Sequence, residues 1–240
     1  MMLRVDAISK SFRGLKAVSS ASFDVPQGAI VALIGPNGAG KTTCFNMIAG
    51  VFSPDSGKII FQEKEIQNKR PDQVCVAGIG RTFQIVKPFA GLSVLDNVIV
   101  GSFLKERTHA GAKAVALQVL KKLHLETKAD LPASSLTLPD RKRLEVARAL
   151  ATRPKLLLLD EVMAGLRPTE TDLMVEVFRD LNRTDGLTIL LIEHVMRAVM
   201  ALAQKVVVLH HGEIIASGAP AEVVRHPAVL ECYLGEETQV

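Results

Sequence analysis

The sequence predicts an α/β fold with parallel strands in its core, and three observations support this prediction. An apolar run, Ala29–Ile34, is typical of a buried strand and leads through a glycine-rich loop into a helical segment, Thr42–Ala49. Two later apolar runs, Leu156–Leu159 and Leu187–Ile192, have the composition of buried parallel strands. Apolar side chains at helical spacing lie between them, at Met174, Val177, Phe178 and Leu181. This alternation implies a parallel sheet covered by helices on both faces.

The first sixty residues are expected to be mostly β structure. Apolar and polar residues alternate from Leu3 to Ala7, and Ala21–Val25 is a second predicted strand. Ser53–Gly57 has the composition of a turn, and Lys58–Phe61 is a further short strand.

Residues 85–150 change from alternation to helical spacing. One apolar helix face is formed by Ala116, Val119, Leu120 and Leu123, at positions i, i+3, i+4 and i+7. We therefore expect an inserted helical subdomain here.

Composition limits the class of protein. The chain has 240 residues, 48% of them apolar, which suits one large domain with an aliphatic core. Its 29 Lys and Arg outnumber 25 Asp and Glu only slightly, and no basic cluster with interleaved aromatics points to nucleic acid. No secretory signal or apolar run of about 18–20 residues is present. We expect a soluble chain that reaches a membrane only through partners.

The three cysteines, Cys44, Cys75 and Cys232, lack the spacing of a disulfide framework or a zinc site, which fits a reducing compartment. Cys44 follows the glycine-rich loop. A chemically sensitive thiol is one interpretation, and a small buried apolar side chain is the favoured one.

The glycine-rich loop matches the phosphate-binding pattern G-x-x-x-x-G-K-[ST] between a predicted strand and a predicted helix. It consists of Gly35, Pro36, Asn37, Gly38, Ala39, Gly40, Lys41, Thr42 and Thr43. The loop amides and the helix N-terminus provide positive potential for phosphate oxygens. Lys41 is expected to reach the β- and γ-phosphates, and the Thr42 hydroxyl to bind Mg²⁺.

Two adjacent acids, Asp160 and Glu161, end the apolar run at Leu156–Leu159. This position places them at the carboxyl edge of the predicted sheet, where the phosphate loop also lies. Asp160 is suited to hold Mg²⁺, and Glu161 is suited to polarise an attacking water. The alternative, that both acids only cap the next segment, is less favoured. His194 follows another predicted strand and is either a γ-phosphate contact or an ordinary surface residue.

The order of these motifs resembles the ATP-binding subunits of ABC transporters over nearly the whole chain. The resemblance implies a P-loop NTPase (RecA-like) core with an antiparallel β subdomain and an inserted helical subdomain. It implies one ABC ATPase domain over 1–240. Residues 1–85 and 151–240 would form the nucleotide-binding core with the β subdomain, and 86–150 the helical subdomain that carries the signature segment.

The same resemblance implies roles for individual residues. Arg81–Gln84 looks like the family's glutamine loop, so Gln84 would contact Mg²⁺ or the lytic water. His194 matches the switch histidine. Phe12 stands where the family places an aromatic that stacks on adenine, although a Phe at a strand end is also a common core residue.

The signature segment departs from the family pattern. Arg141–Leu150 matches the helix that follows it, but the usual Leu-Ser-Gly-Gly-Gln is replaced. The segment is Leu136, Thr137, Leu138, Pro139 and Asp140. Pro has no N–H for a phosphate, and Leu resists glycine-like dihedral angles. Val162 and Arg167 also replace the family's usual Pro and Asp. The contribution to an ATP held by the opposite subunit is therefore open.

Several short features resemble the ATPases of branched-chain amino-acid importers. These are Gly80–Gln84, Ala164–Leu166, Ile192–His194 with Met196, and the ending His226-Pro227 and Tyr233–Gly235. The resemblance implies ATP and Mg²⁺ as cofactors. It also implies two integral-membrane permeases, a second ABC ATPase in a homo- or heterodimer, an indirectly attached periplasmic binding protein, and no nucleic acid. The chain would lie peripherally on the cytoplasmic face of the inner membrane, with Val86, Phe89 and Leu92 near a permease helix or in ordinary packing.

Other functions stay open at this point. The size and tail also resemble the lipopolysaccharide-export ATPase, and urea or short-chain amide importers belong to the same branch. A soluble ABC ATPase bound to nucleic acid or ribosomes is the rival from another class. A small GTPase is a weaker rival, since Asn68-Lys69 is followed at position 71 by Pro and not by Asp.

Overall fold

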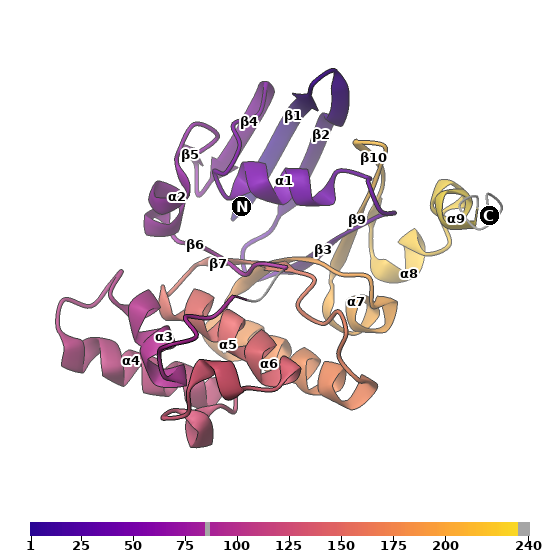
Figure 1. Cartoon of the computed structure of the whole chain (residues 1–240). Coiled ribbons are helices and arrows are strands. Elements are labelled where there is room, and N and C mark those ends of the chain that lie inside the picture. Colours follow the sequence, from indigo (N-terminus) through magenta and orange to yellow (C-terminus); the bar gives the residue numbers. More distant parts are fainter. Residues whose placement is uncertain (85–86, 235–240) are drawn as a thin grey trace. The chain divides into compact units, whose positions relative to one another are not determined.

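The computed structural model describes residues 1–84 and 87–234. The chain forms two compact units. Unit 1 comprises residues 1–74 with 188–240, and unit 2 comprises residues 75–187. Figure 1 labels most elements of both units and colours the chain from its N-terminus to its C-terminus. The expected division into 1–85, 86–150 and 151–240 stays a prediction.

Unit 1 contains an antiparallel sheet in the strand order β2-β1-β4-β5. Its strands are β1 (Leu3–Phe12), β2 (Leu15–Val25), β4 (Ser56–Phe61) and β5 (Lys64–Glu65). β2 begins six residues and β4 two residues before the predicted starts. β2 begins earlier because the chain turns tightly after β1 and pairs with it from Leu15. Apolar and polar residues alternate only weakly in this part of β2, so the sequence pattern does not predict a strand there.

The alternation in β1 holds for its first residues and then breaks. Leu3 and Val5 are buried, but Ala7 is exposed and Ile8 is buried in its place. Ala7 has φ 47°, and the register with β2 shifts between Val5 and Ile8. The expected alternation is therefore wrong at Ala7, because a bulge adds one residue and reverses the face of those that follow.

Unit 1 also contains parallel strands, as predicted. β3 (Ile30–Ile34) pairs in parallel with both β8 (Thr188–Ile192) and β9 (Lys205–His210), and β10 (Glu213–Gly218) pairs antiparallel with β9. Every residue of β3 and β8 is buried, which explains their continuous apolar runs. The helices of unit 1 are α1 (Lys41–Ile48), α7 (Met196–Leu202), α8 (Pro220–Val223) and α9 (Pro227–Leu234).

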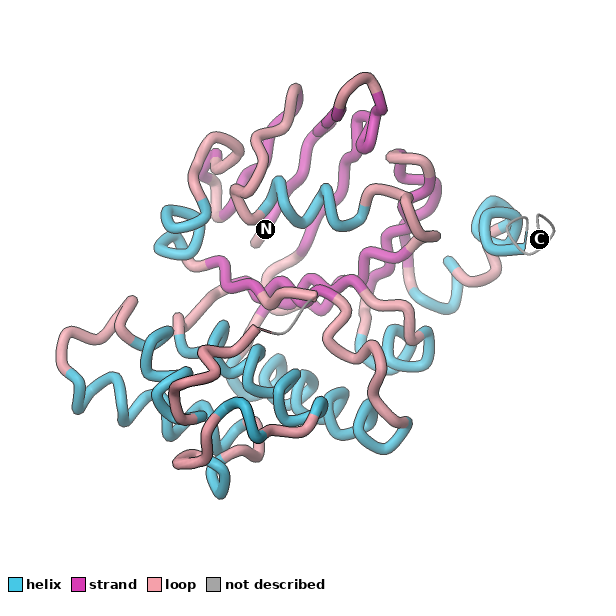
Figure 2. Tube along the Cα trace, in the orientation of Figure 1, coloured by secondary structure: helices cyan, strands magenta, loops and turns pink. Residues whose placement is uncertain are grey.

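Unit 2 is mainly helical. α2 (Pro71–Ala77) crosses the boundary from unit 1, and β6 (Ile79–Arg81) pairs in parallel with β7 (Leu156–Asp160). The main helices are α3 (Val94–Ser102), α4 (His109–Lys122), α5 (Leu138–Ala151) and α6 (Pro168–Asp185), with 3₁₀ turns at Glu126–Lys128 and Ala133–Ser135. The stretch from Val94 to Ala151 consists of helices and loops (Figure 2), which confirms the predicted helical character.

Both predicted apolar helix faces are buried. Ala116, Val119, Leu120 and Leu123 are buried on and just after α4, which packs against α3 and α5. The stripe from Met174 to Leu181 is buried on α6. Over the two described ranges, no helix is both long enough and apolar enough to cross a membrane.

Candidate functional site

The phosphate loop of unit 1 connects β3 to α1, as predicted, and its glycines are required by both dihedral angle and space. Gly35 has φ 147°, and a Cβ there would lie 1.9 Å from the Leu209 carbonyl oxygen. Gly40 has φ 103°, and its Cβ would lie 2.3 Å from the Ala17 carbonyl oxygen. Only glycine fits these two positions without a clash, which explains why the loop has glycine there.

Lys41 lies inside the loop rather than on the surface. Only 6% of Lys41 is exposed, and its ammonium group donates to the carbonyl oxygens of Gly35, at 2.7 Å, and Pro36, at 2.8 Å. These contacts hold a cation at the centre of the loop. Thr42 is exposed at the start of α1, so its hydroxyl is accessible to a ligand.

Cys44 is buried one turn into α1. Burial raises the pKa of its thiol to about 12. The thiol therefore stays protonated at neutral pH, which favours a small apolar packing role over a chemically sensitive one.

His194 lies in unit 1 as well, two residues after β8. In the parallel pair of β3 and β8, Leu33 is level with Ile192. The phosphate loop and His194 therefore leave the same edge of this sheet. His194 is exposed, which is compatible with a ligand contact.

Phe12 lies at the end of β1 in an aromatic pair. Its ring packs edge-to-face against Phe52 with centroids 5.3 Å apart, and the Lys10 ammonium lies 5.8 Å from its centre. With 37% of the residue exposed, Phe12 is not a core side chain. Stacking on adenine stays a prediction.

Unit 2 brings Gln84, Asp160 and Glu161 together. The Gln84 side-chain amide donates to Glu161 Oε2 at 2.7 Å, and Asp160 is only 1% exposed at the end of β7. Arg81 forms an ion pair with Asp160, with 3.2 Å between Nη2 and Oδ2. The segment Arg81–Gln84 therefore contacts both acids. The ion pair of Arg81 with Asp160 was not predicted, although Arg81 is a cation only three residues before Gln84.

Backbone pairing explains why these side chains meet. Thr82 N–H donates to the Leu158 carbonyl oxygen at 2.9 Å, and the Asp160 N–H donates to Thr82 Oγ1 at 3.1 Å. The segment after β6 thus runs beside the end of β7. Glu161 has φ 51°, a conformation that costs about 1–3 kcal/mol for a residue other than glycine. The Lys142 ammonium supports this turn by donating to the Glu161 carbonyl oxygen at 3.0 Å.

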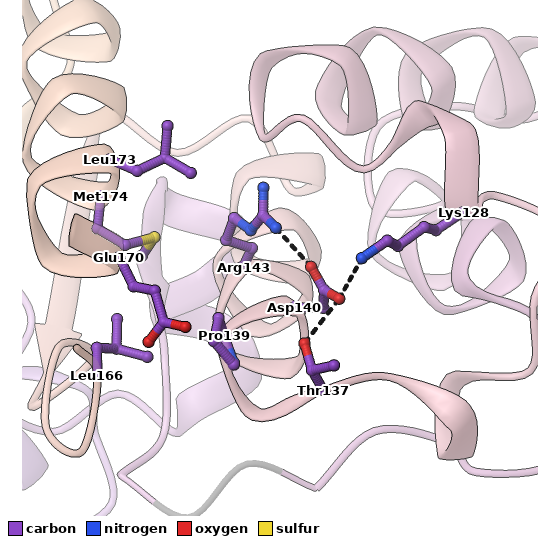
Figure 3. A pocket seen from close by; sticks show the side chains of 9 residues that line it. All are labelled: Lys128, Thr137, Pro139, Asp140, Arg143, Leu166, Glu170, Leu173 and Met174. Atoms are coloured by element: carbon purple, nitrogen blue, oxygen red, sulfur yellow. Dashed lines mark hydrogen bonds and ion pairs between the residues drawn. The ribbon is translucent and has the colours of Figure 1, made fainter.

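The signature segment begins α5, and a buried carboxylate organises it. Asp140, 2% exposed, accepts a hydrogen bond from Thr137 Oγ1 at 2.8 Å and pairs with Lys128 and Arg143. Figure 3 shows the three side chains converging on this carboxylate. They border a cavity of about 240 Å³, whose other lining residues are Pro139, Leu166, Glu170, Leu173 and Met174.

The pKa of Asp140 reflects these partners. Burial, the largest single influence, raises it, but the hydrogen bonds from Lys128 and Thr137 and the positive charges of Arg143 and Lys128 outweigh burial. The pKa therefore lies below its ordinary value. Asp140 is an anion in the first turn of α5, where it neutralises the positive end of the helix dipole.

The residues expected near a permease lie in unit 2. Phe89 is 45% exposed and Leu92 is 38% exposed, while Val86 lies outside the described residues. The Arg148 guanidinium carbon lies 4.6 Å from the centre of the Phe89 ring. Both described side chains are partly packed and partly accessible.

Comparisons with known proteins agree with these motifs. The family model described as ABC transporter matches residues 18–164, and the model described as branched-chain amino acid ATP-binding cassette transporter matches residues 213–238. The high-affinity branched-chain amino acid transport ATP-binding protein LivG of Salmonella typhimurium is 37% identical over 98% of each chain. The lipopolysaccharide export system ATP-binding protein LptB of Acidithiobacillus ferridurans is 34% identical over 100% of this chain and 99% of its own.

A solved structure leads to the same family. An ATP-binding cassette of an ABC transporter, in its ADP conformation, is 32% identical with a TM-score of 0.89 and covers 98% of each chain. The resemblance drawn from the motifs and the predicted fold class are confirmed, and the small-GTPase alternative is excluded. The chain belongs to the ABC transporter family, as one of its ATP-binding and ATP-hydrolysing cassettes.

Proposed function

We propose that this chain energises an importer of branched-chain or related amino acids. The observation that carries the catalytic part is the contact of Gln84 with Glu161 beside the buried Asp160. The substrate class follows from the LivG relatives, which match over nearly the whole chain. The match of the C-terminal segment to the branched-chain amino acid model supports the same choice.

In this proposal the phosphate loop, residues 35–43, binds ATP. Its N–H groups and Lys41 hold the phosphates, and Phe12 stacks on adenine. Glu161 acts as the general base that orients and polarises the attacking water, and Gln84 positions that water. His194 contacts the γ-phosphate and responds to its loss.

The residues assigned to Mg²⁺ offer the oxygen ligands that this ion prefers. Thr42 provides a hydroxyl, Gln84 an amide carbonyl and Asp160 a carboxylate. When bound with ATP, Mg²⁺ would neutralise charge on the phosphoryl oxygens. The chain itself contributes an accessible Thr42 hydroxyl and an Asp160 carboxylate oriented by Arg81.

The partners proposed are two membrane permeases, which the chain would meet on the cytoplasmic face of the inner membrane, and a second ATPase. A periplasmic binding protein would deliver the substrate. Phe89 and Leu92, both partly exposed, are the side chains assigned to the permease contact.

We infer that the second ATPase is a different chain. In the family, the signature segment serves an ATP held by the opposite subunit. Here Thr137 already donates its hydroxyl to Asp140, and Pro139 has no N–H. An ATP from a second copy of this chain would meet Leu138 and Pro139 in place of the two glycines of the family pattern. Two copies would therefore bind ATP poorly between them.

ATP-dependent self-association tests this partner assignment. The Glu161→Gln chain, which should retain ATP, is expected to stay monomeric in size-exclusion chromatography with ATP. Adding Leu138→Gly, Pro139→Gly and Asp140→Gln should produce a dimer. An ATP-dependent dimer with the natural segment would contradict the inference.

Two substitutions test the catalytic roles. Glu161→Gln should preserve ATP binding and lower turnover by about 10²–10⁴-fold, as expected for a lost general base. Lys41→Ala should weaken ATP binding itself. Near-normal turnover in the first variant, or unchanged affinity in the second, would remove the corresponding role.

Purification from native membranes in mild detergent, with mass spectrometry of the associated proteins, tests the transport assignment. Two different permeases and a second ATPase would support amino-acid import. Lipopolysaccharide-export partners would move the function to export. Recovery only with nucleic acid or ribosomes would overturn the transport role and leave the ATPase intact.

A further inference from the structure

One face of α5 carries three charged side chains that have little contact with solvent. Lys142, Glu145 and Arg148 are spaced three residues apart. Lys142 is 6% exposed and Glu145 is 4% exposed, while the Arg148 side chain is 22% exposed. Burying charged groups is costly unless they are paired and hydrogen-bonded. Their partners therefore indicate what this face holds in place.

Glu145 contacts the backbone of Phe83, next to Gln84, and Arg148 contacts Lys87 and Phe89. The Glu145 carboxylate accepts a hydrogen bond from the Phe83 backbone N–H and pairs with Arg148, with 3.0 Å between Oε2 and Nη1. The same Nη1 donates to the Lys87 carbonyl oxygen at 3.1 Å, and the guanidinium lies over the Phe89 ring. The Glu145–Arg148 ion pair therefore connects Phe83 to the segment before α3.

Lys142 extends this arrangement to the acid itself. Its ammonium donates to the Glu161 carbonyl oxygen, and Gln84 donates to the Glu161 carboxylate. Both members of the Gln84–Glu161 hydrogen bond are therefore held from the same helix. Glu145 fixes the backbone beside Gln84, and Lys142 fixes the backbone of Glu161.

We propose that Glu145 and Arg148 are positioning residues that hold Gln84 against Glu161 and link this contact to Phe89. A partner that moves Phe89 would shift Arg148, and through Glu145 it would shift the backbone beside Gln84. The proposal deepens the proposed function, because it rests on the catalytic roles given there to Gln84 and Glu161.

A purely structural ion pair is the alternative. Unit 2 contains a matched pair with the same three-residue spacing, Glu176–Arg179 on α6, whose side chains are 61% and 46% exposed. Both side chains of that pair are largely exposed, unlike those of Glu145 and Arg148. Glu176→Gln is therefore the control, since it removes the same charge from an exposed pair on another helix.

The first test is backbone hydrogen exchange in the full-length chain, followed at Phe83 by NMR. Glu145→Gln preserves the side-chain shape and leaves a neutral acceptor, so exchange at Phe83 should quicken by about tenfold. Arg148→Gln does not touch Phe83, yet it should also quicken exchange there, because Glu145 loses the cation that orients it. Glu176→Gln should leave Phe83 exchange unchanged.

The second test separates kcat from KM for ATP, measured in the complex that this chain forms with its partner ATPase and the permeases. Glu145→Gln should lower kcat by about tenfold with little change in KM, because it loosens a contact used in the chemical step and not in binding. Glu145→Ala should lower kcat further, and the partial activity of Glu145→Gln then counts as rescue by the conservative variant. If Glu145→Ala does not fold, Glu145→Gln decides alone.

Unchanged exchange at Phe83, or a loss confined to KM, would overturn the proposal. A failure of the proposed function is distinguishable, because Glu161→Gln in the same series would then retain normal turnover. Normal kcat in Glu145→Gln combined with impaired Glu161→Gln would sink the positioning role alone.

Discussion

Replacing Arg81 with methionine tests how much the site depends on a charge that the motif pattern does not include. Arg81 lies beside Asp160, with side chains 12% and 2% exposed. Methionine fills a similar length without the positive charge. The substitution Arg81→Met therefore leaves the Asp160 carboxylate in place, buried, and without this cation.

The expected cost follows from the separation of 3.2 Å between Arg81 Nη2 and Asp160 Oδ2. With an effective dielectric constant of about 20, unit charges at this distance attract by roughly 5 kcal/mol. Removing one partner of a buried ion pair costs about 3–5 kcal/mol in unfolding free energy, because the remaining charge is no longer compensated. We expect Arg81→Met to fall in that range.

Urea unfolding of the full-length chain measures this loss, with Arg183→Met as the matched control. Arg183 pairs with Asp180 in the same unit, but the two side chains are 75% and 61% exposed. Removing an exposed pair should change stability little. Adding Asp160→Asn to Arg81→Met should recover most of the loss. If Arg81→Met lowers the unfolding free energy no more than Arg183→Met does, the ion pair with Arg81 does not stabilise the buried Asp160 carboxylate.

Three further predictions concern pH, thiol chemistry and backbone conformation. The folded-state pKa of Asp140 is lowered, so the ionised carboxylate stabilises the fold above its ordinary pKa of 3.8. This contribution is lost as the pH falls further. In an acid titration below about pH 5, the stability of Asp140→Asn should therefore drop less steeply than that of the unmodified chain. Cys44, with a pKa of about 12, should resist a thiol reagent at pH 8 in the folded chain and react after denaturation; rapid labelling of native protein would contradict its burial. Gly28 has φ 73° and open space around its Cβ position, so Gly28→Ala should lower the unfolding free energy by about 1–2 kcal/mol. Gly50→Ala should lower it clearly more in the same assay, because its Cβ would lie 2.4 Å from the Lys69 carbonyl oxygen. Equal losses would show that this close contact is relieved without a cost in free energy.

Much of the site was predictable because its signals are local. The phosphate loop needs glycines and a lysine at fixed spacing between a strand and a helix, and 35–43 meets that condition. Asp160 and Glu161 end a fully buried strand, so their place at a sheet edge follows from chain direction alone. The bulge at Ala7 was not predictable, since a single added residue leaves no mark in the alternation before it.

The α/β class, the ATP-binding motif and the two acids could be predicted, because each depends on residues within a few positions of one another. The charges that those residues meet could not. Arg81 reaches Asp160 across 79 positions, and Lys142 reaches the Glu161 backbone from another helix. Likewise, the partners of Asp140 emerge only when Lys128 and α5 pack together. Such contacts depend on how elements distant in sequence pack against each other, and no local pattern records that packing.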